Sequence, residues 1–264
     1  MTFLKRVLGR LRRLMMSVVW SLRAIALFKN WWTYFRLLRA RGAERRVLEM
    51  RKGERLYVRE NVWDARIIRE IFVERPYTKG IRDLPPNPLV VDVGGYIGDF
   101  SIYAASRLNA NVIVYEPTLE NWTMLKDNVA LNGLESRVTL VNKAVGRDGT
   151  LTLNVEVSGQ EVHSSSRWYP GAPQRDVPSL TLDQVVANHE LDKIDLLKVD
   201  CEGGEYDLFR YASDDVLARV DRVTLEWHGV GPETDDLLHE LRDRLGAAGF
   251  KLQTTGPQVL SGTR

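Results

Sequence analysis

The chain has 264 residues, a length that fits one α/β domain with extensions or, less readily, two small domains. Hydrophobic residues make up 44% and charged residues 27%, which is ordinary for a soluble protein. The single cysteine, Cys201, excludes an intramolecular disulfide and fits a reducing compartment, so we expect a cytoplasmic protein. We expect no nucleic-acid partner, and the sequence has no internal repeat, zinc-ligand spacing or low-complexity tract.

The net charge of +2 is distributed unevenly along the chain. Residues 1–43 hold ten lysines and arginines and no acidic residue, whereas residues 44–264 hold 27 basic and 35 acidic residues, a net charge of −8. A basic tail on an acidic globule indicates a segment that directs the protein to a partner surface. We therefore treat residues 1–43 as a basic amphipathic region, residues 44–88 as a lead-in and residues 89–264 as the main domain.

The apolar pattern over residues 3–38 predicts an amphipathic helix, because aliphatic and aromatic residues recur at steps of three and four. Its longest uncharged run, Leu14 to Leu22, has nine residues, far fewer than the roughly 20 that a membrane-spanning helix needs. Basic residues combined with tryptophans are typical of helices that lie on anionic membranes. We expect this segment to bind the cytoplasmic face of a membrane peripherally. Docking on the main domain or on a protein partner, and a transit peptide, are the alternatives.

The next segment predicts a short lead-in to the main domain. Residues 45–59 have the pattern of a hairpin that turns at Lys52-Gly53, and residues 63–73 have the pattern of a helix. Residues 83–88 are rich in proline and connect this part of the chain to the first core strand.

The stretch from Leu89 to Phe100 combines a short apolar run, three glycines and the start of a helical pattern. Such a run suits a strand buried on both faces of a parallel sheet. Gly94 and Gly95 would allow a sharp turn and a close approach of a ligand to the backbone, and Gly98 would let the following helix pack closely. A strand, a glycine turn and a helix form a frame in which backbone N–H groups and a helix N-terminus meet a polar ligand.

An acidic residue, Glu116, ends the second apolar strand, 18 residues after Gly98. This is near the spacing at which a carboxylate accepts hydrogen bonds from a ribose diol. The order of Asp92, glycine turn and Glu116 therefore predicts a site for a nucleoside-containing cofactor, with a tight turn beside an unrelated surface glutamate as the alternative. The first glycine of a dinucleotide fingerprint would fall at Val93, so the pattern for NAD is incomplete.

The main domain alternates strands and helices, as α/β proteins do. We expect strands at residues 89–93, 112–116, 138–142, 194–200, 222–227 and 250–254, and helices at residues 99–107, 118–131, 180–188, 203–211 and 234–248. Residues 143–178 depart from this rhythm, because 150–157 alternate like an extra strand and 159–178 are polar and turn-rich. We interpret 159–178 as a loop that forms a lid over the acceptor, with a solvated surface excursion as the alternative.

A second group of polar residues follows two of the predicted strands. Asp200 and Glu202 lie two residues apart at the end of one strand, and Glu226 and His228 repeat this step at the end of another. Ligands of open α/β sheets bind at the carboxyl ends of the strands. We therefore expect these three carboxylates and one imidazole to lie together at that edge of the sheet. Cys201, between the first two, is expected to be a small buried residue rather than a nucleophile.

Several short motifs follow one another along the main domain. They are residues 92–100 (DVGGYIGDF), 115–117 (YEP), 144–146 (AVG), 179–183 (SLTLD), 194–205 (IDLLKVDCEGGE) and 226–228 (EWH). Together they resemble the FkbM family of class I S-adenosylmethionine-dependent methyltransferases over about residues 66–254, most specifically at 194–205. Gly95 and Tyr96 depart from the family's usual Ala-Asn, so contacts around the methionine end of the cofactor are expected to differ.

The resemblance implies a Rossmann-like class I methyltransferase fold, an α/β fold with a mostly parallel central sheet flanked by helices, here with an N-terminal helical extension. It implies S-adenosylmethionine as cofactor and O-methylation of a hydroxyl on a glycan, a glycolipid or lipid-linked sugar, or a natural product. A family tyrosine near the cofactor would correspond to Tyr77, although we favour an ordinary loop tyrosine there. The residues expected to bind the cofactor are Asp92, Gly94, Gly95, Tyr96, Gly98, Asp99, Glu116, Ala144 and Asp200.

A hydroxyl acceptor needs a base or a metal ion to become nucleophilic. In the favoured mechanism His228, whose ordinary pKa is about 6.5, takes the proton, Glu226 orients its ring, and Asp200 and Glu202 position acceptor and cofactor. In the alternative mechanism these four residues hold Mg²⁺ or Mn²⁺. Ligand spacing on strands is weak support for a metal site, so the metal-free mechanism is preferred. An NAD-dependent oxidoreductase and a non-catalytic, membrane-associated adaptor that retains the fold are the rival functions.

Overall fold

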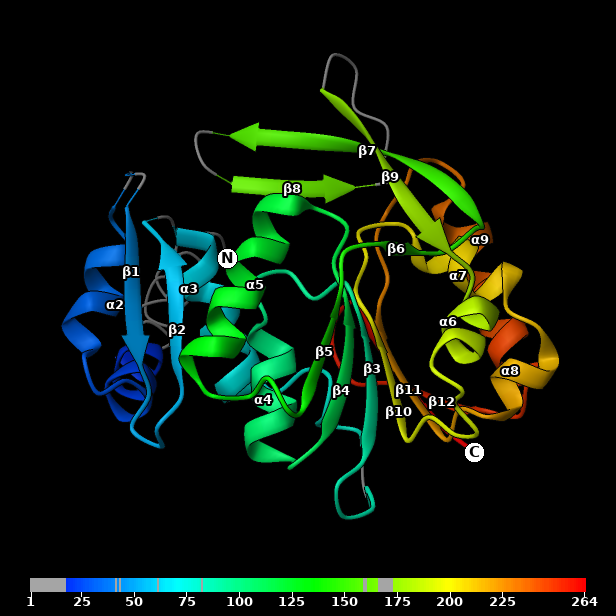
Figure 1. The fold of residues 1–264 in the computed structure, drawn as a ribbon, viewed down its shortest axis with the longest axis horizontal. Helices are drawn as coiled ribbons and strands as arrows, with labels where there is room; N and C mark the ends of the chain where they lie inside the picture. The colour runs from blue at the N-terminus through cyan, green and yellow to red at the C-terminus, as the bar shows by residue number, and fades with distance from the viewer. Residues whose placement is uncertain are drawn as a thin grey trace, which may run out of the picture.

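A computed structural model describes residues 18–40, 42, 44–60, 62–81, 83–158, 161–165 and 173–264. Within these residues seven strands form a central sheet (Figure 1). Their spatial order is β12 (Lys251–Thr254), β13 (Val259–Thr263), β11 (Arg222–Glu226), β10 (Leu196–Val199), β3 (Leu89–Val93), β4 (Asn111–Tyr115) and β5 (Val138–Val141). The strands from β11 to β5 are parallel, whereas β13 is antiparallel to both of its neighbours. The mostly parallel sheet is confirmed; β13 was not predicted.

Helices cover both faces of the central sheet (Figure 1). One face carries α4 (Asp99–Arg107) and α5 (Leu119–Leu131). The opposite face carries α6 (Leu182–Asn188), α7 (Glu205–Tyr211), α8 (Asp214–Ala218) and α9 (Thr234–Ala247). Each helix that the sequence predicts in the main domain is found within two residues of its expected ends, and only the short α8 is additional among these six.

Strand β3 is buried on both faces because successive side chains point to opposite sides of a strand. Val90 packs in the cluster that contains α4 and α5, whereas Val91 and Val93 pack in the cluster of the opposite face. None of the three is more than 1% exposed. The apolar run therefore forms the doubly buried strand that the sequence predicts, and Asp92 is the charged residue within it.

A hairpin and a helix lead into the main domain, as expected. β1 (Arg45–Glu49) pairs with β2 (Arg55–Arg59), and the turn contains Lys52 and Gly53. α3 (Val62–Arg69) continues into a π-helical turn, η1 (Glu70–Glu74). The hairpin is attached to α5, because the Asn128 side chain accepts from the Tyr57 N–H at 2.6 Å and donates to the Tyr57 carbonyl at 3.1 Å. This attachment holds α3 beside the carboxyl ends of the central strands.

The N-terminal segment forms two helices rather than one. Residues 18–27 are helical, Phe28 forms an isolated bridge with Met50, and α2 (Trp31–Leu37) follows. The prediction of one continuous helix over residues 3–38 is therefore wrong at residues 28–30, and residues 3–17 lie outside the described part of the chain. The helical ladder ends at the Phe28 N–H, which donates to the Ala24 carbonyl. The break follows from pairing with the hairpin, because the next N–H, that of Lys29, donates to the Glu49 carbonyl instead.

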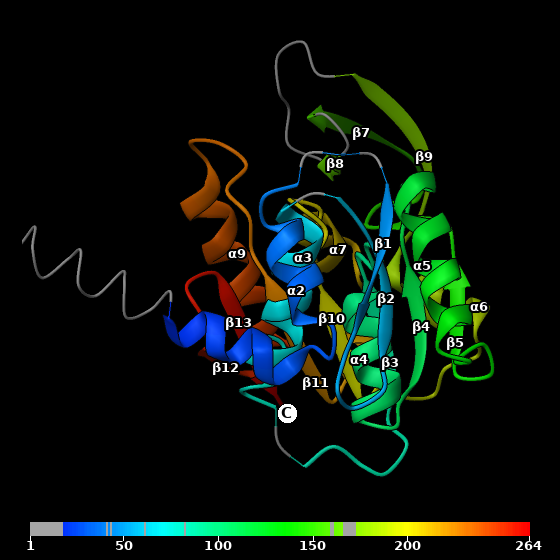
Figure 2. The same cartoon turned by 90° about the vertical axis from the view of Figure 1, so that its left-hand side faces the viewer.

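The same segment contributes to the core of the protein. Ala24, Phe28, Tyr34 and Leu37 are at most 2% exposed and share a hydrophobic cluster with α3, α4 and the hairpin. Figure 2 faces this side of the molecule and shows α2 and the hairpin in front of the central sheet. Within the described residues, no helix has the length and apolar character that crossing a membrane requires.

A second sheet lies over the carboxyl ends of the central strands (Figure 1). Its strands, in spatial order, are β6 (Ala144–Val145), β9 (Gln174–Leu180), β7 (Gly149–Ser158) and β8 (Glu161–Ser165). The extra strand expected at 150–157 is confirmed in β7. The prediction of a loop over 159–178 is wrong for 161–165 and 174–178, because these residues pair with β7 in antiparallel register. Residues 159–160 and 166–172 lie outside the described part of the chain.

Candidate functional site

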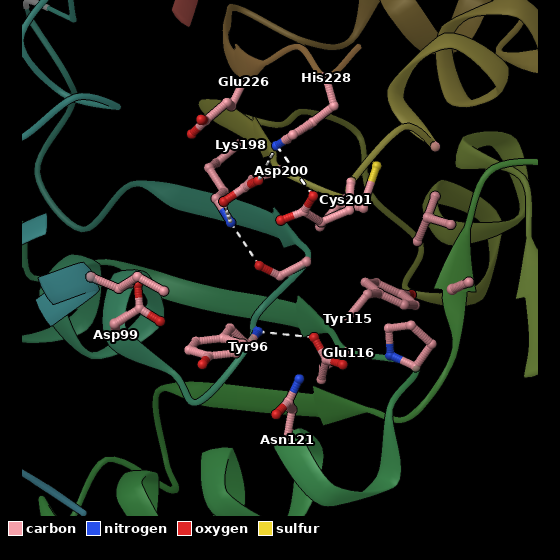
Figure 3. A pocket seen from close by; sticks show the side chains of 18 of the residues that line it. Tyr96, Asp99, Tyr115, Glu116, Asn121, Lys198, Asp200, Cys201, Glu226 and His228 are labelled. Atoms are coloured by element: carbon pink, nitrogen blue, oxygen red, sulfur yellow. Dashed lines mark hydrogen bonds and ion pairs between the residues drawn. The ribbon is translucent and has the colours of Figure 1, made fainter. Parts of the chain in front are cut away.

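A cavity of about 380 Å³ lies where β3, β4, β10 and β11 end. Ligand pockets typically have volumes of roughly 300–1,000 Å³. In Figure 3, Glu116 and Asn121 lie toward one end of the cavity, and Asp200, Glu226 and His228 lie toward the other. The two polar groups predicted from the sequence therefore share one cavity.

The wall of the cavity also contains residues that the sequence did not identify. α3 contributes Trp63 and Arg66, β7 contributes Leu151 and Leu153, and α5 contributes Asn121. None of these belongs to the quoted motifs, and their local patterns are those of ordinary helix and strand residues. Their position follows from the attachment of α3 to the core and from the pairing of the second sheet, which a local pattern does not specify.

Gly94 brings the loop after β3 against the loop after β10. Its backbone has φ +84°, and a Cβ atom there would lie 1.7 Å from the carbonyl oxygen of Asp200. Only glycine fits this contact and this conformation. Tyr96, two residues on, also has a positive φ, +47°, and its N–H donates to Glu116 at 2.9 Å. The turn thus fixes backbone and carboxylate together at one end of the cavity.

Glu116 is 4% exposed and lines the cavity. Its carboxylate also accepts from the Thr118 N–H at 2.8 Å. Burial raises the pKa of Glu116 to about 7, against the lowering effect of the Thr118 and Tyr96 N–H donors. The carboxylate is held by backbone donors, not by a cation, and its remaining lone pairs can accept hydrogen bonds from a ligand.

Asp92 lies behind the cavity, not in its wall. It is fully buried, accepts from the Ser101 hydroxyl at 2.6 Å and lies 3.0 Å from Nζ of Lys198. Lys198 also donates to the Gly94 carbonyl at 2.7 Å and lies 3.8 Å from Asp200. Burial alone would lower the pKa of Lys198, but the charges of Asp92 and Asp200 raise it above its ordinary value. The buried ammonium therefore ties the two loops together.

The other expected cofactor residues divide into two groups. Tyr96, Asp99 and Ala144 line the cavity with Gly94, Glu116 and Asp200, whereas Gly95 and Gly98, like Asp92, are not among its lining residues. Asp99 is 6% exposed at the start of α4, and burial raises its pKa to about 7.

Asp200, Glu202 and His228 converge as the two-residue steps predict. One ligand atom from each of the three lies within 4.8 Å of the others. His228 Nε2 is 3.8 Å from Asp200 Oδ1 and 3.6 Å from Glu202 Oε2. Its other nitrogen, Nδ1, is 3.4 Å from Glu205 Oε1.

These neighbours determine the charge of the imidazole. Burial lowers the pKa of His228, but Glu205, Asp200 and Glu202 together outweigh it and raise the pKa to about 10. The ring is therefore cationic at neutral pH when only these residues surround it. A cationic ring cannot accept a proton, so these neighbouring charges oppose the role of base, which stays a prediction.

Glu226 does not orient the His228 ring, contrary to the sequence-based mechanism, because Glu205 lies against Nδ1. Glu226 instead accepts from the Tyr77 hydroxyl at 2.7 Å, and this hydroxyl also lies 2.8 Å from Asp200 Oδ2. Tyr77 is 4% exposed. The interpretation of Tyr77 as an ordinary loop residue is therefore wrong, whereas its family resemblance pointed to the site.

Glu205 was quoted in a motif but not identified as a site residue. Its side chain is fully buried and accepts from the N–H groups of Gly203 at 2.8 Å and His228 at 2.6 Å. Cys201 lines the cavity, and burial, followed by the charge of Glu205, raises the pKa of its thiol well above the ordinary value. This favours the protonated thiol over the nucleophilic thiolate. The prediction of a buried residue is wrong, because Cys201 is only half-buried at the cavity wall.

Comparisons with known proteins identify relatives of the chain. A family model described as the methyltransferase FkbM domain matches residues 92–252. Methyltransferase sdnD of Sordaria araneosa is 29% identical over 210 residues, which are 66% of this chain and 80% of that protein. The 31-O-demethyl-FK506 methyltransferase FkbM of Streptomyces tacrolimicus is 25% identical over 233 residues, which are 77% of this chain and 88% of that protein.

Parts of two solved methyltransferase structures match this chain at low sequence identity. The METTL16 methyltransferase domain matches with a TM-score of 0.46 and 11% identity, over 82% of this chain and 86% of that chain. An rRNA methylase from Streptococcus thermophilus matches with a TM-score of 0.43 and 12% identity, over 69% of this chain and 89% of that chain.

Proposed function

Because the chain belongs to the FkbM family of methyltransferases, we propose that it transfers a methyl group from S-adenosylmethionine to a hydroxyl group of a glycan, glycolipid or natural product. The observation that carries the proposal is one cavity with a backbone-held carboxylate, Glu116, at one end and the cluster of Asp200, Glu202 and His228 at the other. The cofactor supplies an electrophilic methyl group on its sulfonium. The protein has to align the acceptor with that group and exclude water.

The residues at the Glu116 end fit the cofactor. The carboxylate of Glu116 would accept hydrogen bonds from the ribose hydroxyls, a role that its position after β4 suits. Tyr96, Asp99 and Asn121 supply polar groups in the same part of the wall. The close contact of Gly94 with the Asp200 carbonyl leaves room only for bare backbone beside the cofactor. These residues bind and orient the cofactor.

The opposite end of the cavity suits a hydroxyl acceptor. Three carboxylates, those of Asp200, Glu202 and Glu226, line it with His228, and such groups accept hydrogen bonds from hydroxyls. The name of the Streptomyces relative describes methylation on oxygen, which supports an oxygen acceptor here. Leu151 and Leu153 of β7 add an apolar wall, and the second sheet that carries them would act as the lid over the acceptor.

We also propose that the protein works peripherally on the cytoplasmic face of a membrane. Val18, Leu22 and Trp32 are 52%, 61% and 60% exposed on the N-terminal helices. The same segment belongs to the stretch of 43 residues with ten basic residues and no acidic one. Exposed apolar side chains combined with positive charge favour binding to an anionic lipid surface.

The cofactor proposal is tested by the variant Glu116→Ala. Loss of a buried acceptor of two hydroxyls should weaken the binding of S-adenosylhomocysteine by about 1–3 kcal/mol, or roughly fivefold to 150-fold. Calorimetry on the full chain measures this affinity, and Glu135→Ala, which removes an exposed glutamate, is the matched control. An unchanged affinity in Glu116→Ala, or binding of NAD by the wild type instead, would overturn the proposal.

A further inference from the structure

We infer that Asp200, Glu202 and His228 hold a divalent cation, Mg²⁺ or Mn²⁺, in the acceptor half of the cavity. The inference adds a cation to the proposed active site. The role that we give to this ion, activation of the acceptor, rests on the proposed function. The three side chains come from the ends of two neighbouring strands, β10 and β11, and line the cavity. Their ligand atoms lie within 4.8 Å of one another.

The ligand distances suit a shared ion. His228 Nε2 lies 3.6 Å from the nearest oxygen of Glu202 and 3.8 Å from that of Asp200. Two ligands of one Mg²⁺ at the usual bond length are roughly 3–4 Å apart. An ion can therefore lie between these three atoms with little movement of the side chains. Two carboxylate oxygens are hard ligands that suit Mg²⁺ or Mn²⁺, and the single imidazole nitrogen, a borderline ligand, suits Mn²⁺ better than Mg²⁺.

The imidazole is oriented as a metal ligand usually is. A histidine that binds a metal through one nitrogen commonly donates its other N–H to a carboxylate, which fixes the ring. Here Glu205 Oε1 lies 3.4 Å from Nδ1, close enough to become the acceptor after a small turn of the ring, although Nδ1 makes no hydrogen bond with the described residues in the present arrangement. Glu205 has no exposed surface and is itself fixed by two backbone donors, the N–H groups of Gly203 and His228. A neutral ring with its proton on Nδ1 would direct the lone pair of Nε2 at Asp200 and Glu202.

The aspartate is oriented in the same way. Asp200 Oδ2 lies 2.8 Å from the hydroxyl oxygen that Tyr77 shares between Asp200 and Glu226, and 3.8 Å from Nζ of Lys198, whereas Oδ1 is the oxygen nearest His228. One oxygen is thus held by the protein, and the other is left for an ion. Glu226, which the sequence suggested as a fourth ligand, is outside the group because it is held by Tyr77.

The site is accessible to water and to an acceptor. The side chains of Asp200 and Glu202 are 28% and 45% exposed, and three protein ligands leave further positions of a six-coordinate ion free. A hydroxyl bound beside a divalent cation has a lowered pKa. The ion would therefore lower the pKa of an acceptor hydroxyl bound at one of these free positions, which is the activation that methyl transfer to oxygen needs.

Direct titration of Mn²⁺ into the full chain, followed by electron paramagnetic resonance of the free ion, tests the inference. We expect one Mn²⁺ per wild-type chain, displaced by Mg²⁺. Glu202→Gln should weaken binding at least about tenfold, and Glu205→Gln, which loosens the ring, roughly tenfold to 100-fold. Asp207→Asn removes a carboxylate that lines the same cavity outside the cluster and should leave Mn²⁺ affinity unchanged.

The outcomes separate this inference from the proposed function. Absence of Mn²⁺ binding by the wild type, or equal affinity in Glu202→Gln and Asp207→Asn, overturns the cation site. S-adenosylhomocysteine affinity, measured on the same samples, tests the cofactor half independently. A protein that binds the cofactor product but not Mn²⁺ retains the proposed function without the ion; a protein that binds Mn²⁺ but not the cofactor product contradicts the function. Circular dichroism checks that each variant is folded.

Discussion

The hydroxyl of Tyr77 has one proton and lies within hydrogen-bond distance of two carboxylates, those of Asp200 and Glu226. Burial, followed by the charge of Asp200, raises the pKa of Glu226 above its ordinary value. Tyr77 therefore keeps two like charges at the mouth of the cavity in a fixed arrangement, although it is distant from both in sequence.

We predict that Tyr77→Phe destabilises the protein by about 1–3 kcal/mol, because two half-buried carboxylates lose the hydroxyl that they share. Denaturant unfolding at neutral pH measures the change. Tyr211→Phe, at a site that is 51% exposed, is the control and should have no measurable effect. Equal stability of the two variants would contradict a structural role for the shared hydroxyl.

The sequence predicts the convergence of Asp200, Glu202 and His228 because parallel neighbouring strands end at one edge, and the two-residue step places side chains on one side. It does not predict which side chains form hydrogen bonds with these carboxylates. Tyr77 meets Asp200 across 123 residues and Glu226 across 149 residues. Such contacts depend on packing of the lead-in segment, which no local pattern encodes.

At the scale of elements, the strands and helices with a clear hydrophobic pattern were predicted from the sequence. The strands β9 and β13, which depend on hydrogen bonding to a neighbouring strand, were not. The apolar run of β3 and the helices of the main domain have strong periodicity. β9 and β13 contain polar and turn-forming residues, such as Pro178 and Gly262, that weaken a strand pattern. β9 is a strand because it pairs with β7 over six residues, a contact that lies outside its own sequence.

The N-terminal helices lead to a prediction about membranes. Removing residues 1–41 would also remove Phe28 and Tyr34 from the core, so exposed side chains have to be changed instead. Leu22→Ser with Trp32→Ser should weaken binding to vesicles of anionic phospholipid at least about tenfold, because two apolar side chains no longer enter the lipid. Added salt should weaken the binding of the wild type.

Vesicle sedimentation measures this binding, and Leu119→Ser is the matched control because Leu119 is 56% exposed at the start of α5. The control should bind like the wild type. A wild type that ignores anionic vesicles, or a double variant that binds as tightly as Leu119→Ser, would favour a protein partner for this surface.

At the scale of the whole molecule, buried carboxyl groups link stability to pH. The pKa of Asp99 is about 7 in the folded protein, above its ordinary value of 3.8. A raised carboxyl pKa means that the folded state binds more protons between these two values, so its contribution to the free energy of unfolding falls as pH rises through this window. The ionised Asp99 side chain therefore lowers the free energy of unfolding more at pH 8 than at pH 5.

We predict that Asp99→Asn stabilises the unliganded protein more at pH 8 than at pH 5, with a difference on the order of 2 kcal/mol. Urea unfolding of both proteins at both pH values gives this difference. Asp215→Asn, at an exposed position in the first turn of α8, is a control that should show no such dependence. The same stability difference at the two pH values would show that Asp99 is not buried as a titrating group.

The position of β13 constrains the order in which the sheet can be completed. In the described part of the chain, β12 joins the sheet only through β13, although β13 follows it in sequence. During synthesis β12 therefore has no partner, and β11 has an open edge, until residues 259–263 have left the ribosome. Open strand edges pair readily with other chains. Until that short segment emerges, a newly made molecule exposes an edge at which it can associate with its neighbours.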